Sequence, residues 1–460
     1  MIEQVSENYD IIVVGAGPAG MSAAMAAAEA GASVLLLDDQ PAPGGQIYRG
    51  ILSASKERMK ILGASYRDGL KLTQSLLAST VNYRPRATVW QFDEEGSVIF
   101  SINGQVHQAS AKHIILATGA LERPMPIPGW TLPGVMTAGA AQILLKSSSL
   151  VPEETVLAGS GPLLYLLASQ LIKAGAAPKA IVETQSTQDF FAATRFFPRP
   201  GVGWREIFKG LMMLHEIKKA GVPRFNAATN LSAEGTEAVQ ALTFTAKGDQ
   251  HRIECSTLLL HQGVVPNTQI TRSLRLEHKW NKRQTSFQAL SNGVGQTTNL
   301  NYSVVGDGRM IGGAKVAALE GRCAGAFVAS SFGYQVEPTE VFKLQKQIKK
   351  HRAVRSFLDR LYQPPEELLS PADDTIVCRC EAVTAGQIRS YAANGCFGPN
   401  QTKAFGRSGM GPCQGRYCAL TVTEILAKEN SLSQQEVGSY RIRSPIKPIT
   451  LGEMAQLHKD

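Results

Sequence analysis

The chain has 460 residues, 43% hydrophobic and 18% charged, so it is long enough for two or three domains and is not disordered in composition. Its net charge of +9 is mild and spread along the chain, with one denser run at residues 343–355 that we interpret as a solvated helix face. Without a basic cluster or a recognisable module, this charge argues against nucleic acid as a partner; contact with an acidic partner or a membrane surface stays open.

No stretch of the sequence predicts secretion or a membrane span. The acidic N-terminus leads directly into a strand, and no apolar run reaches the roughly 18 residues that span a bilayer. We therefore expect a soluble, cytoplasmic protein, with the inner face of the membrane as a second candidate location. In that compartment the seven cysteines are not expected to form a disulfide framework.

The dominant motif follows the first predicted strand, residues 11–14. A glycine turn, an Ala-rich helix over residues 21–30 and a second strand over residues 34–37 come next, and an acidic pair ends the unit. This is the complete dinucleotide-binding fingerprint, in which the glycines permit the tight turn, the approach of a pyrophosphate and close helix packing. A glycine-rich turn in an ordinary α/β protein is the simpler alternative, which the completeness of the motif disfavours. The residues concerned are Gly15, Ala16, Gly17, Pro18, Ala19, Gly20, Asp38 and Asp39.

Three further glycine motifs follow in chain order. Residues 43–46 read Pro-Gly-Gly-Gln, which lets the backbone lie close to a flat ligand and supplies an amide that donates and accepts. A buried strand that begins at His113 ends in Ala-Thr-Gly at residues 117–119, and a strand that begins at Tyr302 ends in Gly-Asp-Gly at residues 306–308. The aspartate of the last motif can accept hydroxyl hydrogens, and the helix after it can face a phosphate.

Residues 155–183 repeat the opening pattern of strand, glycine turn, helix and strand. The turn contains Gly159 and Gly161, but Leu164 stands where the third glycine is expected. The leucine holds the helix away from the strand, which argues against NAD(P) binding. We expect a vestigial site or one for another adenine nucleotide; if NAD(P) binds, Glu183 favours NAD over NADP.

Four of the seven cysteines lie near the C-terminal end, as the pairs Cys378/Cys380 and Cys413/Cys418 separated by 32 residues. Two close pairs of thiolates suit a [2Fe–2S] cluster or a tetrahedral Zn²⁺. A flavin elsewhere in the chain would favour the cluster, because flavins can pass single electrons to a one-electron centre. The other three cysteines are interpreted as packing residues or buried thiols: Cys255, Cys323 and Cys396.

Taken in order, the glycine motifs resemble those of the thioredoxin-reductase-like flavoproteins over about residues 8–335. The resemblance implies an α/β fold with two Rossmann-like domains, the first of which binds FAD. It does not imply disulfide reduction, because the redox Cys-x-x-Cys of the thioredoxin reductases is missing and Cys255 is the only cysteine between residues 150 and 300. The implied FAD-binding residues are Gly15, Ala16, Gly17, Pro18, Ala19 and Gly20 at the pyrophosphate, Asp38 and Asp39 at the adenosine ribose, Gly45 and Gln46 along the flavin, Ala117, Thr118 and Gly119 beside the FAD, and Gly306 and Asp307 at the ribityl–phosphate region.

The cysteine-rich segment resembles the BFD-like [2Fe–2S] domain that is appended to amino-acid and opine dehydrogenases. The implied cluster ligands are Cys378, Cys380, Cys413 and Cys418. The whole chain resembles the large (α) subunit of heteromeric FAD-dependent dehydrogenases, the group of the D-hydroxyproline, octopine/nopaline and L-proline dehydrogenases and hydrogen cyanide synthase. In that group a separate amine-oxidase-like flavoprotein, the β subunit, oxidises the substrate, and some members hold FMN between the subunits.

The implied domains are an FAD-binding domain (residues 1–125 and 295–335), a degenerate NAD-type domain (126–294), a linker helix (336–372) and a mainly α [2Fe–2S] domain with a tail (373–460).

The implied function is electron transfer. A β subunit oxidises a secondary amine, amino acid or opine, and electrons pass through flavin and cluster to a quinone or dye. A small third subunit is a further candidate partner. Two alternatives stay open, an NAD(P)H-dependent flavin reductase that feeds its own cluster and a nucleotide-binding scaffold. The sequence identifies no catalytic residue.

Overall fold

The computed structural model describes residues 7–197 and 204–457. Its first unit is a seven-stranded sheet. Its strands are β3 (Asn82–Arg84), β2 (Val34–Leu37), β1 (Glu7–Val14), β6 (Gln105–Leu116), β5 (Ser97–Ile102) and β4 (Thr88–Phe92) in this order, with β19 (Tyr302–Val304) against β6. The central strands are parallel and buried on both faces, so they are continuously apolar. The Asn103–Gly104 pair forms a two-residue hairpin turn between β5 and β6, and both residues have positive φ.

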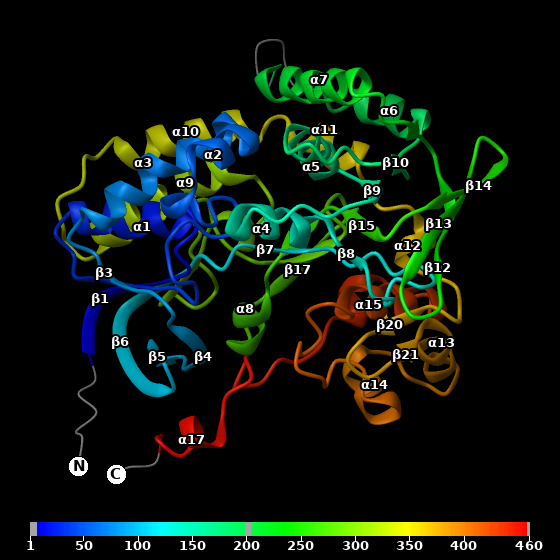
Figure 1. Ribbon diagram of the computed structural model, residues 1–460. Coiled ribbons are helices and arrows are strands. Elements are labelled where there is room, and N and C mark those ends of the chain that lie inside the picture. Colours follow the sequence, from blue (N-terminus) through cyan, green and yellow to red (C-terminus); the bar gives the residue numbers. More distant parts are fainter. Residues whose placement is uncertain (1–6, 198–203, 458–460) are drawn as a thin grey trace.

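Helices cover one face of this sheet. They are α1 (Pro18–Glu29), α2 (Lys56–Leu62), α3 (Ala64–Leu77) and α9 (Ala314–Ser331), with the short turn η1 (Ile51–Ser53) before α2. Figure 1 shows them above the blue strands, with the β4–β5 hairpin on the other side. The Ala-rich sequence of α1 is explained by its contact with α9. A Cβ added to Gly321 would lie 1.9 Å from the carbonyl oxygen of Ala19, so the two helices touch backbone to backbone.

The second unit is a five-stranded parallel sheet. Its strands are β11 (Arg224–Phe225), β10 (Ala180–Glu183), β9 (Thr155–Ser160), β15 (Thr257–Gln262) and β8 (Val135–Thr137), and its helices are α4 (Ala138–Ser148), α5 (Pro162–Lys173), α6 (Thr187–Thr194) and α7 (Trp204–Lys219). An antiparallel sheet of β12 (Thr229–Gly235), β13 (Val239–Ala246) and β14 (Asp249–Glu254) is attached to it. The strand pair β7 (Ala120–Glu122) and β16 (Val264–Pro266) joins the two units, and α8 (Gln269–Ser273) and the hairpin of β17 (His278–Asn281) and β18 (Ser286–Ala289) follow it.

The segment expected to be a linker contains α10 (Glu340–Arg352), α11 (Arg355–Leu361) and α12 (Glu366–Leu369). The three helices pack against different units: α10 against α9, α11 against α6, and α12 against the C-terminal unit. Leu344 and Ile348 of α10 are buried against α9, whereas its lysines are exposed. The interpretation of residues 343–355 as a solvated face therefore holds for the lysines but is wrong for Arg352, whose side chain is only 16% exposed and ion-paired.

The C-terminal unit is small and mainly helical. It contains β20 (Ile376–Cys378), β21 (Val383–Thr384), α13 (Ala385–Ala393), α14 (Pro399–Gly406), α15 (Ala419–Glu429) and α16 (Gln434–Val437). Ile388, Val422, Ile425 and Tyr440 lie in its core. An extended tail then crosses back to the first unit and ends in α17 (Leu451–Met454), below β4 and β5 in Figure 1.

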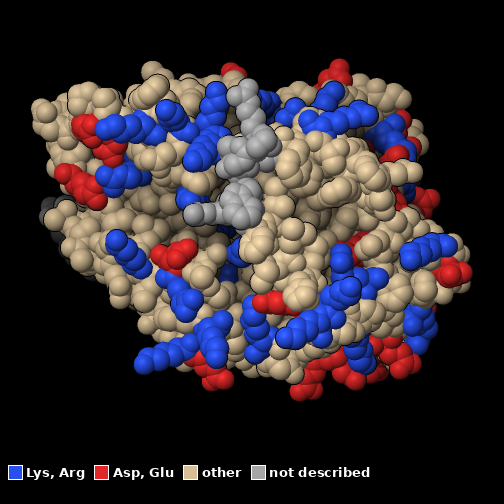
Figure 2. Space-filling model, turned by 90° about the horizontal axis from the view of Figure 1, so that it is seen from above, with Lys and Arg blue, Asp and Glu red and all other residues tan. Residues whose placement is uncertain are grey.

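Charges of both signs are mixed on the surface. On the face shown in Figure 2, Lys and Arg are interspersed with acidic and uncharged residues and do not form one continuous patch. Over residues 7–197 and 204–457, no helix is both long and apolar enough to cross a bilayer.

Candidate redox site

The glycine motifs of the first unit come together at one edge of its sheet. Because β2, β1, β6 and β19 are parallel neighbours, the turns that follow them meet at their carboxyl ends. Backbone hydrogen bonds tie the strand ends together, with 2.7 Å from the Gly15 N–H to the Leu37 carbonyl and 2.9 Å from the Ala117 N–H to the Val14 carbonyl. This is the edge at which ligands bind in open α/β sheets.

The glycines at this edge leave a cradle that side chains would fill. A Cβ on Gly20 would lie 1.7 Å from the Gly15 carbonyl oxygen, and a Cβ on Gly45 would lie 2.8 Å from the Gly17 Cα. The loop of residues 43–46 therefore lies directly against the fingerprint turn. Gly119 and Gly313 instead face open space, with no atom within 4 Å of an added Cβ. The backbone is thus exposed where an extended dinucleotide has to lie.

Two helices begin at this cradle without a side-chain cap. The N-cap residues are Gly17 for α1 and Gly313 for α9, and neither position has a side-chain hydrogen bond to the free N–H groups of the first turn. Uncapped N–H groups and the positive end of the helix dipole favour phosphate. The residues present therefore fit a group with a pyrophosphate, such as FAD.

The acidic residues of the motifs are already hydrogen-bonded within the chain. Asp38 accepts from the N–H groups of Ala16 and Gln40, and its burial raises its pKa to about 6 despite these bonds. Asp39 forms an ion pair with Lys447 of the tail, with 2.7 Å between Oδ2 and Nζ. The side chain of Asp39 is therefore bound to the tail and not to the glycine turn. Asp307 accepts from the N–H groups of Gly312 and Gly313 at 2.7 and 2.9 Å, and so fixes the loop before α9.

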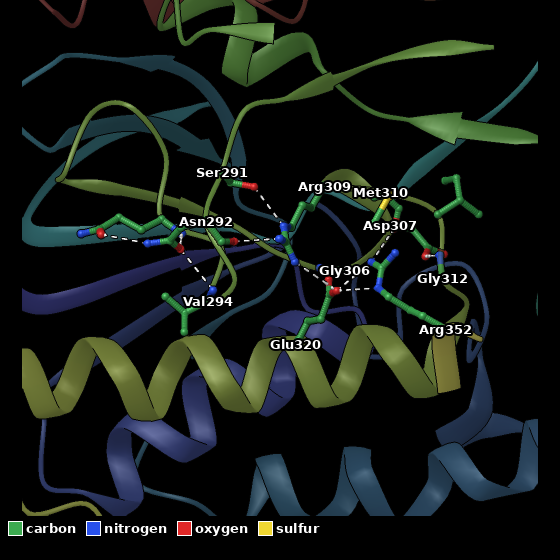
Figure 3. A network of polar contacts seen from close by, with 12 residues as sticks. Ser291, Asn292, Val294, Gly306, Asp307, Arg309, Met310, Gly312, Glu320 and Arg352 are labelled. Carbon is green, nitrogen blue, oxygen red and sulfur yellow. Dashed lines mark hydrogen bonds and ion pairs between the residues drawn. The ribbon is translucent and has the colours of Figure 1, made fainter. Parts of the chain in front are cut away.

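A buried carboxylate supports the turn η2 (Gly306–Gly308) from the side of α9 (Figure 3). Glu320, whose side chain is 3% exposed, accepts from the Gly306 N–H at 3.1 Å. It also pairs with Arg309 at 3.2 Å and Arg352 at 2.6 Å. Arg309 follows η2, Glu320 lies in α9 and Arg352 lies in α10. Because the three residues are far apart in the chain, the sequence does not predict this network.

Replacing Glu320 with glutamine should destabilise the chain by about 3 kcal/mol, because two guanidinium groups would lose their buried counter-charge. Denaturant unfolding followed by circular dichroism measures the change. Glu337→Gln is the control, since Glu337 is an exposed carboxylate that pairs with Lys343 at 2.7 Å, and it should leave the transition unchanged. Equal transitions for Glu320→Gln and the wild type would show that the network does not stabilise the chain.

A buried amine lies against the loop expected along the flavin. Lys146 of α4 donates to the Gln46 carbonyl at 3.0 Å and to the Gln142 side chain at 2.8 Å. Burial lowers its pKa to about 7. We did not predict a role for this residue, because a single lysine at the end of an otherwise apolar helix resembles an ordinary surface residue.

The second glycine turn lies against a leucine and a histidine. Leu164 is fully buried in the core beneath it, and the imidazole of His261 lies 3.2 Å from where a Cβ of Gly161 would be. His261 is held by Glu122, with 2.5 Å between Nδ1 and Oε1.

Glu183, expected to be an available ribose acceptor, is fully engaged within the protein. It is 0% exposed and receives two hydrogen bonds from the guanidinium nitrogen Nη2 of Arg224, at 2.8 and 2.9 Å. Tyr165 and Gln185 also donate to it. Arg224 neutralises Glu183 in this structure, and the preference for NAD over NADP that Glu183 would give if NAD(P) binds stays a prediction.

The four C-terminal cysteines approach one another as two pairs. Cys378 at the end of β20 and Cys418 before α15 share a hydrogen bond, which lowers the pKa of Cys378 to about 6. Cys380 and Cys413 form the other thiol–thiol contact. Across the described part of the chain, no three His, Cys, Asp or Glu side chains converge on a single ion. Four cysteines in two pairs fit a cluster in which each of two irons takes two of them.

The other cysteines lie outside these pairs, as expected. Cys255, Cys323 and Cys396 are 3%, 1% and 0% exposed. Glycine makes room beside the pairs, since a Cβ on Gly411 would lie 2.2 Å from the Cβ of Cys380.

One short segment touches both the cradle and the cysteine pairs. Asn267 donates its N–H to the Gly119 carbonyl at 3.0 Å, and two residues later the side chain of Gln269 donates to the Gln414 carbonyl at 3.3 Å. Gln414 directly follows Cys413. Figure 1 shows α8 between the first sheet and the orange C-terminal unit. The two candidate redox sites are therefore neighbours within one chain.

Comparisons with known proteins agree with this architecture. Residues 9–321 match the pyridine nucleotide-disulphide oxidoreductase family, and residues 376–428 match the BFD-like [2Fe-2S] binding domain. Fold and site together define a thioredoxin-reductase-like, flavin-dependent oxidoreductase that carries FAD and a [2Fe–2S] cluster. Zn²⁺, the alternative for the cysteines, is thereby set aside.

Similarity over the whole length is more specific. The chain is 42% identical to a subunit of the opine oxidase of Rhizobium meliloti, covering 98% of this chain and 88% of that protein. It is 30% identical to the HcnB subunit of the hydrogen cyanide synthase of Pseudomonas aeruginosa, covering 98% and 99%. The chain belongs to this family of opine oxidase subunits. L-proline dehydrogenase from P. horikoshii has the same fold, with a TM-score of 0.70 over 98% of this chain and 81% of that one, at 18% identity.

Proposed function

We propose that this chain is the electron-transferring subunit of a heteromeric dehydrogenase that oxidises an opine, an amino acid or another secondary amine. The relatives at 42% and 30% identity are named as subunits, one of an opine oxidase and one of hydrogen cyanide synthase. In this proposal an amine-oxidase-like β subunit binds and oxidises the substrate, so the residues that select the substrate lie on that chain. Further proposed components are an FMN between the subunits and a small third subunit.

The observation that carries this proposal is the contact between the two sites through residues 267–269. FAD supplies two-electron and one-electron redox chemistry, and a [2Fe–2S] cluster supplies one-electron chemistry. Asn267 holds the Gly119 backbone at the FAD cradle, and Gln269 holds the Gln414 backbone beside Cys413. This arrangement would keep the two centres at a fixed separation.

The residues proposed to bind FAD act mainly through their backbone. The turn of residues 15–20 and the N-terminus of α9 would bind the pyrophosphate, and Asp38 would accept from the adenosine ribose with its remaining lone pairs. Gly45 and Gln46 would lie along the flavin, Thr118 and Gly119 beside the middle of the cofactor, and Asp307 at the ribityl group. Cys378, Cys380, Cys413 and Cys418 would bind the two irons.

One of the two cysteine pairs, Cys380 and Cys413, lies near the surface, which suits transfer to a quinone or dye. Cys380 is exposed, and Gly411 and Pro412 beside it line an open cavity of about 500 Å³. We place the enzyme in the cytoplasm, with the inner face of the membrane as the proposed site of contact with a quinone.

The proposal predicts that NADH does not reduce this flavin. A nicotinamide dinucleotide needs a third glycine and an available acidic side chain in the second unit. Leu164 replaces the glycine, and Glu183 is already paired with Arg224. Anaerobic addition of NADH to the purified chain should leave flavin absorbance unchanged over minutes, whereas dithionite should bleach it. Prompt bleaching by NADH would instead support the flavin reductase alternative. A vestigial site, or one for an adenine nucleotide other than NAD(P), stays our proposal for the second unit.

Co-purification and a substrate panel test the proposal as a whole. The chain is expressed with the product of its neighbouring gene, and dye reduction is assayed with octopine, nopaline, proline and hydroxyproline. We expect activity with at least one substrate in the complex and none in either chain alone. Full activity of the partner chain alone, at the same rate as the complex, would favour the scaffold alternative.

A further inference from the structure

Tyr440 approaches the cysteine pairs from the tail, beyond residues 376–428 that match the [2Fe–2S] domain. The side chain is buried, with 2% of the residue exposed. Its hydroxyl oxygen lies 3.9 Å from Sγ of Cys418, within the reach of a hydrogen bond to sulfur. A residue outside the matched domain therefore contacts one of the proposed ligands.

Glycines and a lysine hold the Tyr440 ring in place. A Cβ on Gly409 or Gly415 would lie 2.6 or 2.5 Å from the ring, so both glycines pack directly on it. The ammonium group of Lys403 lies 5.2 Å from the ring centroid. Gly409 and Gly415 are on either side of Cys413 in the chain, so the tyrosine and the ligand loop are packed as one unit.

Two further hydroxyl groups orient the phenol oxygen. Ser408 Oγ lies 3.0 Å from it and Thr402 Oγ1 lies 3.3 Å from it, and Thr402 itself donates to the Pro399 carbonyl at 2.7 Å. Ser408 and Thr402 are both 0% exposed.

The direction of the hydrogen bond follows from the chemistry of the ligand. A cysteine that binds iron is a thiolate and can only accept, so the Tyr440 hydroxyl has to donate. A donor to a ligating sulfur stabilises the more negative, reduced form of an iron–sulfur cluster and raises its reduction potential.

We propose that Tyr440 is a positioning residue that raises the reduction potential of the [2Fe–2S] cluster by donating a hydrogen bond to Cys418. The inference rests on the assignment of the cluster to the four cysteines, and not on the identity of the substrate or the partner subunit. The tail thus has a role in the redox site as well as in joining the units.

The test is a redox titration of the full-length chain, with Tyr440→Phe compared with the wild type after anaerobic cluster assembly. At a fixed potential, the reduced-to-oxidised ratio of the variant should fall about threefold to tenfold, where tenfold corresponds to about 59 mV for a one-electron couple. Iron per chain should be unchanged. The signal of the reduced cluster in electron paramagnetic resonance measures the ratio without any enzyme assay.

Tyr391→Phe is the matched control, because it removes the same atom from a tyrosine of the same unit whose hydroxyl lies against Gly406. Its potential should equal that of the wild type. Ser408→Ala removes one hydrogen-bond partner of the phenol and should lower the reduction potential by less than Tyr440→Phe does. If Tyr440→Phe assembles no cluster, the potential of Ser408→Ala tests the proposal instead.

A wild-type potential in Tyr440→Phe at normal iron content would overturn the proposal. So would an equal shift in Tyr391→Phe, and so would an unchanged potential in Ser408→Ala if Tyr440→Phe assembles no cluster. If the wild-type chain itself assembles no cluster from iron and sulfide, the cluster assignment fails instead, which is a separate outcome.

Discussion

Cys413→Ser should lose the [2Fe–2S] cluster, keep FAD and abolish substrate-driven dye reduction by the complex. Losing even an outer-shell partner of a metal ligand costs 10–100-fold in metal affinity or activity, so removal of a ligand should lower iron per chain by at least about tenfold. Serine keeps the size of the side chain and replaces only the sulfur. Iron analysis, flavin absorbance and the dye assay measure the three quantities on one preparation.

Cys396→Ser is the control for this experiment. Cys396 is 0% exposed and its thiol donates to the Gly398 carbonyl at 3.5 Å, outside the two thiol pairs. It should keep both the cluster and the activity. Unchanged activity of the complex with cluster-free Cys413→Ser would mean that electrons do not pass through this cluster, and the scaffold alternative would then be favoured.

Gly20→Ala should abolish FAD binding. The added Cβ would lie 1.7 Å from the Gly15 carbonyl oxygen and 3.2 Å from the Ala117 Cβ, so α1 has to move away from the turn that binds the pyrophosphate. Overpacking of a core by one methyl costs about 1–3 kcal/mol, and a clash with backbone reaches the upper end of this range or exceeds it. The flavin-to-protein ratio of the purified variant measures the loss.

The matched control is Gly210→Ala. Gly210 lies within α7, and an added Cβ there has no atom within 4 Å. This variant should keep its full flavin content, because alanine is accommodated and favours the helix. Equal flavin content in both variants would contradict the assignment of the residues 15–20 turn to FAD.

The glycine motifs were predictable because each depends on a local sequence. A glycine turn between an apolar strand and an Ala-rich helix determines its own geometry, and parallel pairing brings successive turns to one edge. The same holds for the Asn103–Gly104 hairpin and for the close spacing of Cys378 with Cys380 and of Cys413 with Cys418. The thiol contacts, Cys378 with Cys418 and Cys380 with Cys413, join residues far apart in the chain. Assignment of FAD and the [2Fe–2S] cluster followed from these motifs and is confirmed by the family matches.

The contacts that were not predictable from the sequence join residues far apart in the chain. Glu183 looked like a ribose acceptor because it ends a strand, but Arg224, 41 residues later, neutralises it. The partners Glu320 and Arg352 are 32 residues apart, and Tyr440 reaches Cys418 from 22 residues away. Contacts of this kind depend on how whole units pack, so the local pattern of residues does not predict them.

The packing of the units also changes the role of the segments between them. Within residues 336–372, α10 packs on the first unit through Leu344 and Ile348, and Phe357 of α11 packs on Phe190 of the second unit. The tail connects the two redox sites, because Arg416 beside the cysteine loop donates to the Ile446 carbonyl at 2.6 Å and Lys447 next to it pairs with Asp39 at 2.7 Å. A chain built in this way holds its two sites in one arrangement, which suits electron transfer.

The most direct test of electron transfer through this chain is to add substrate anaerobically to the purified complex and freeze it for electron paramagnetic resonance. We predict that the signal of a reduced [2Fe–2S] cluster appears as the flavin bleaches, and that the same signal is absent from the complex with Cys413→Ser. Substrate that bleaches the flavin and supports dye reduction while the cluster of the wild-type complex stays oxidised would contradict this prediction.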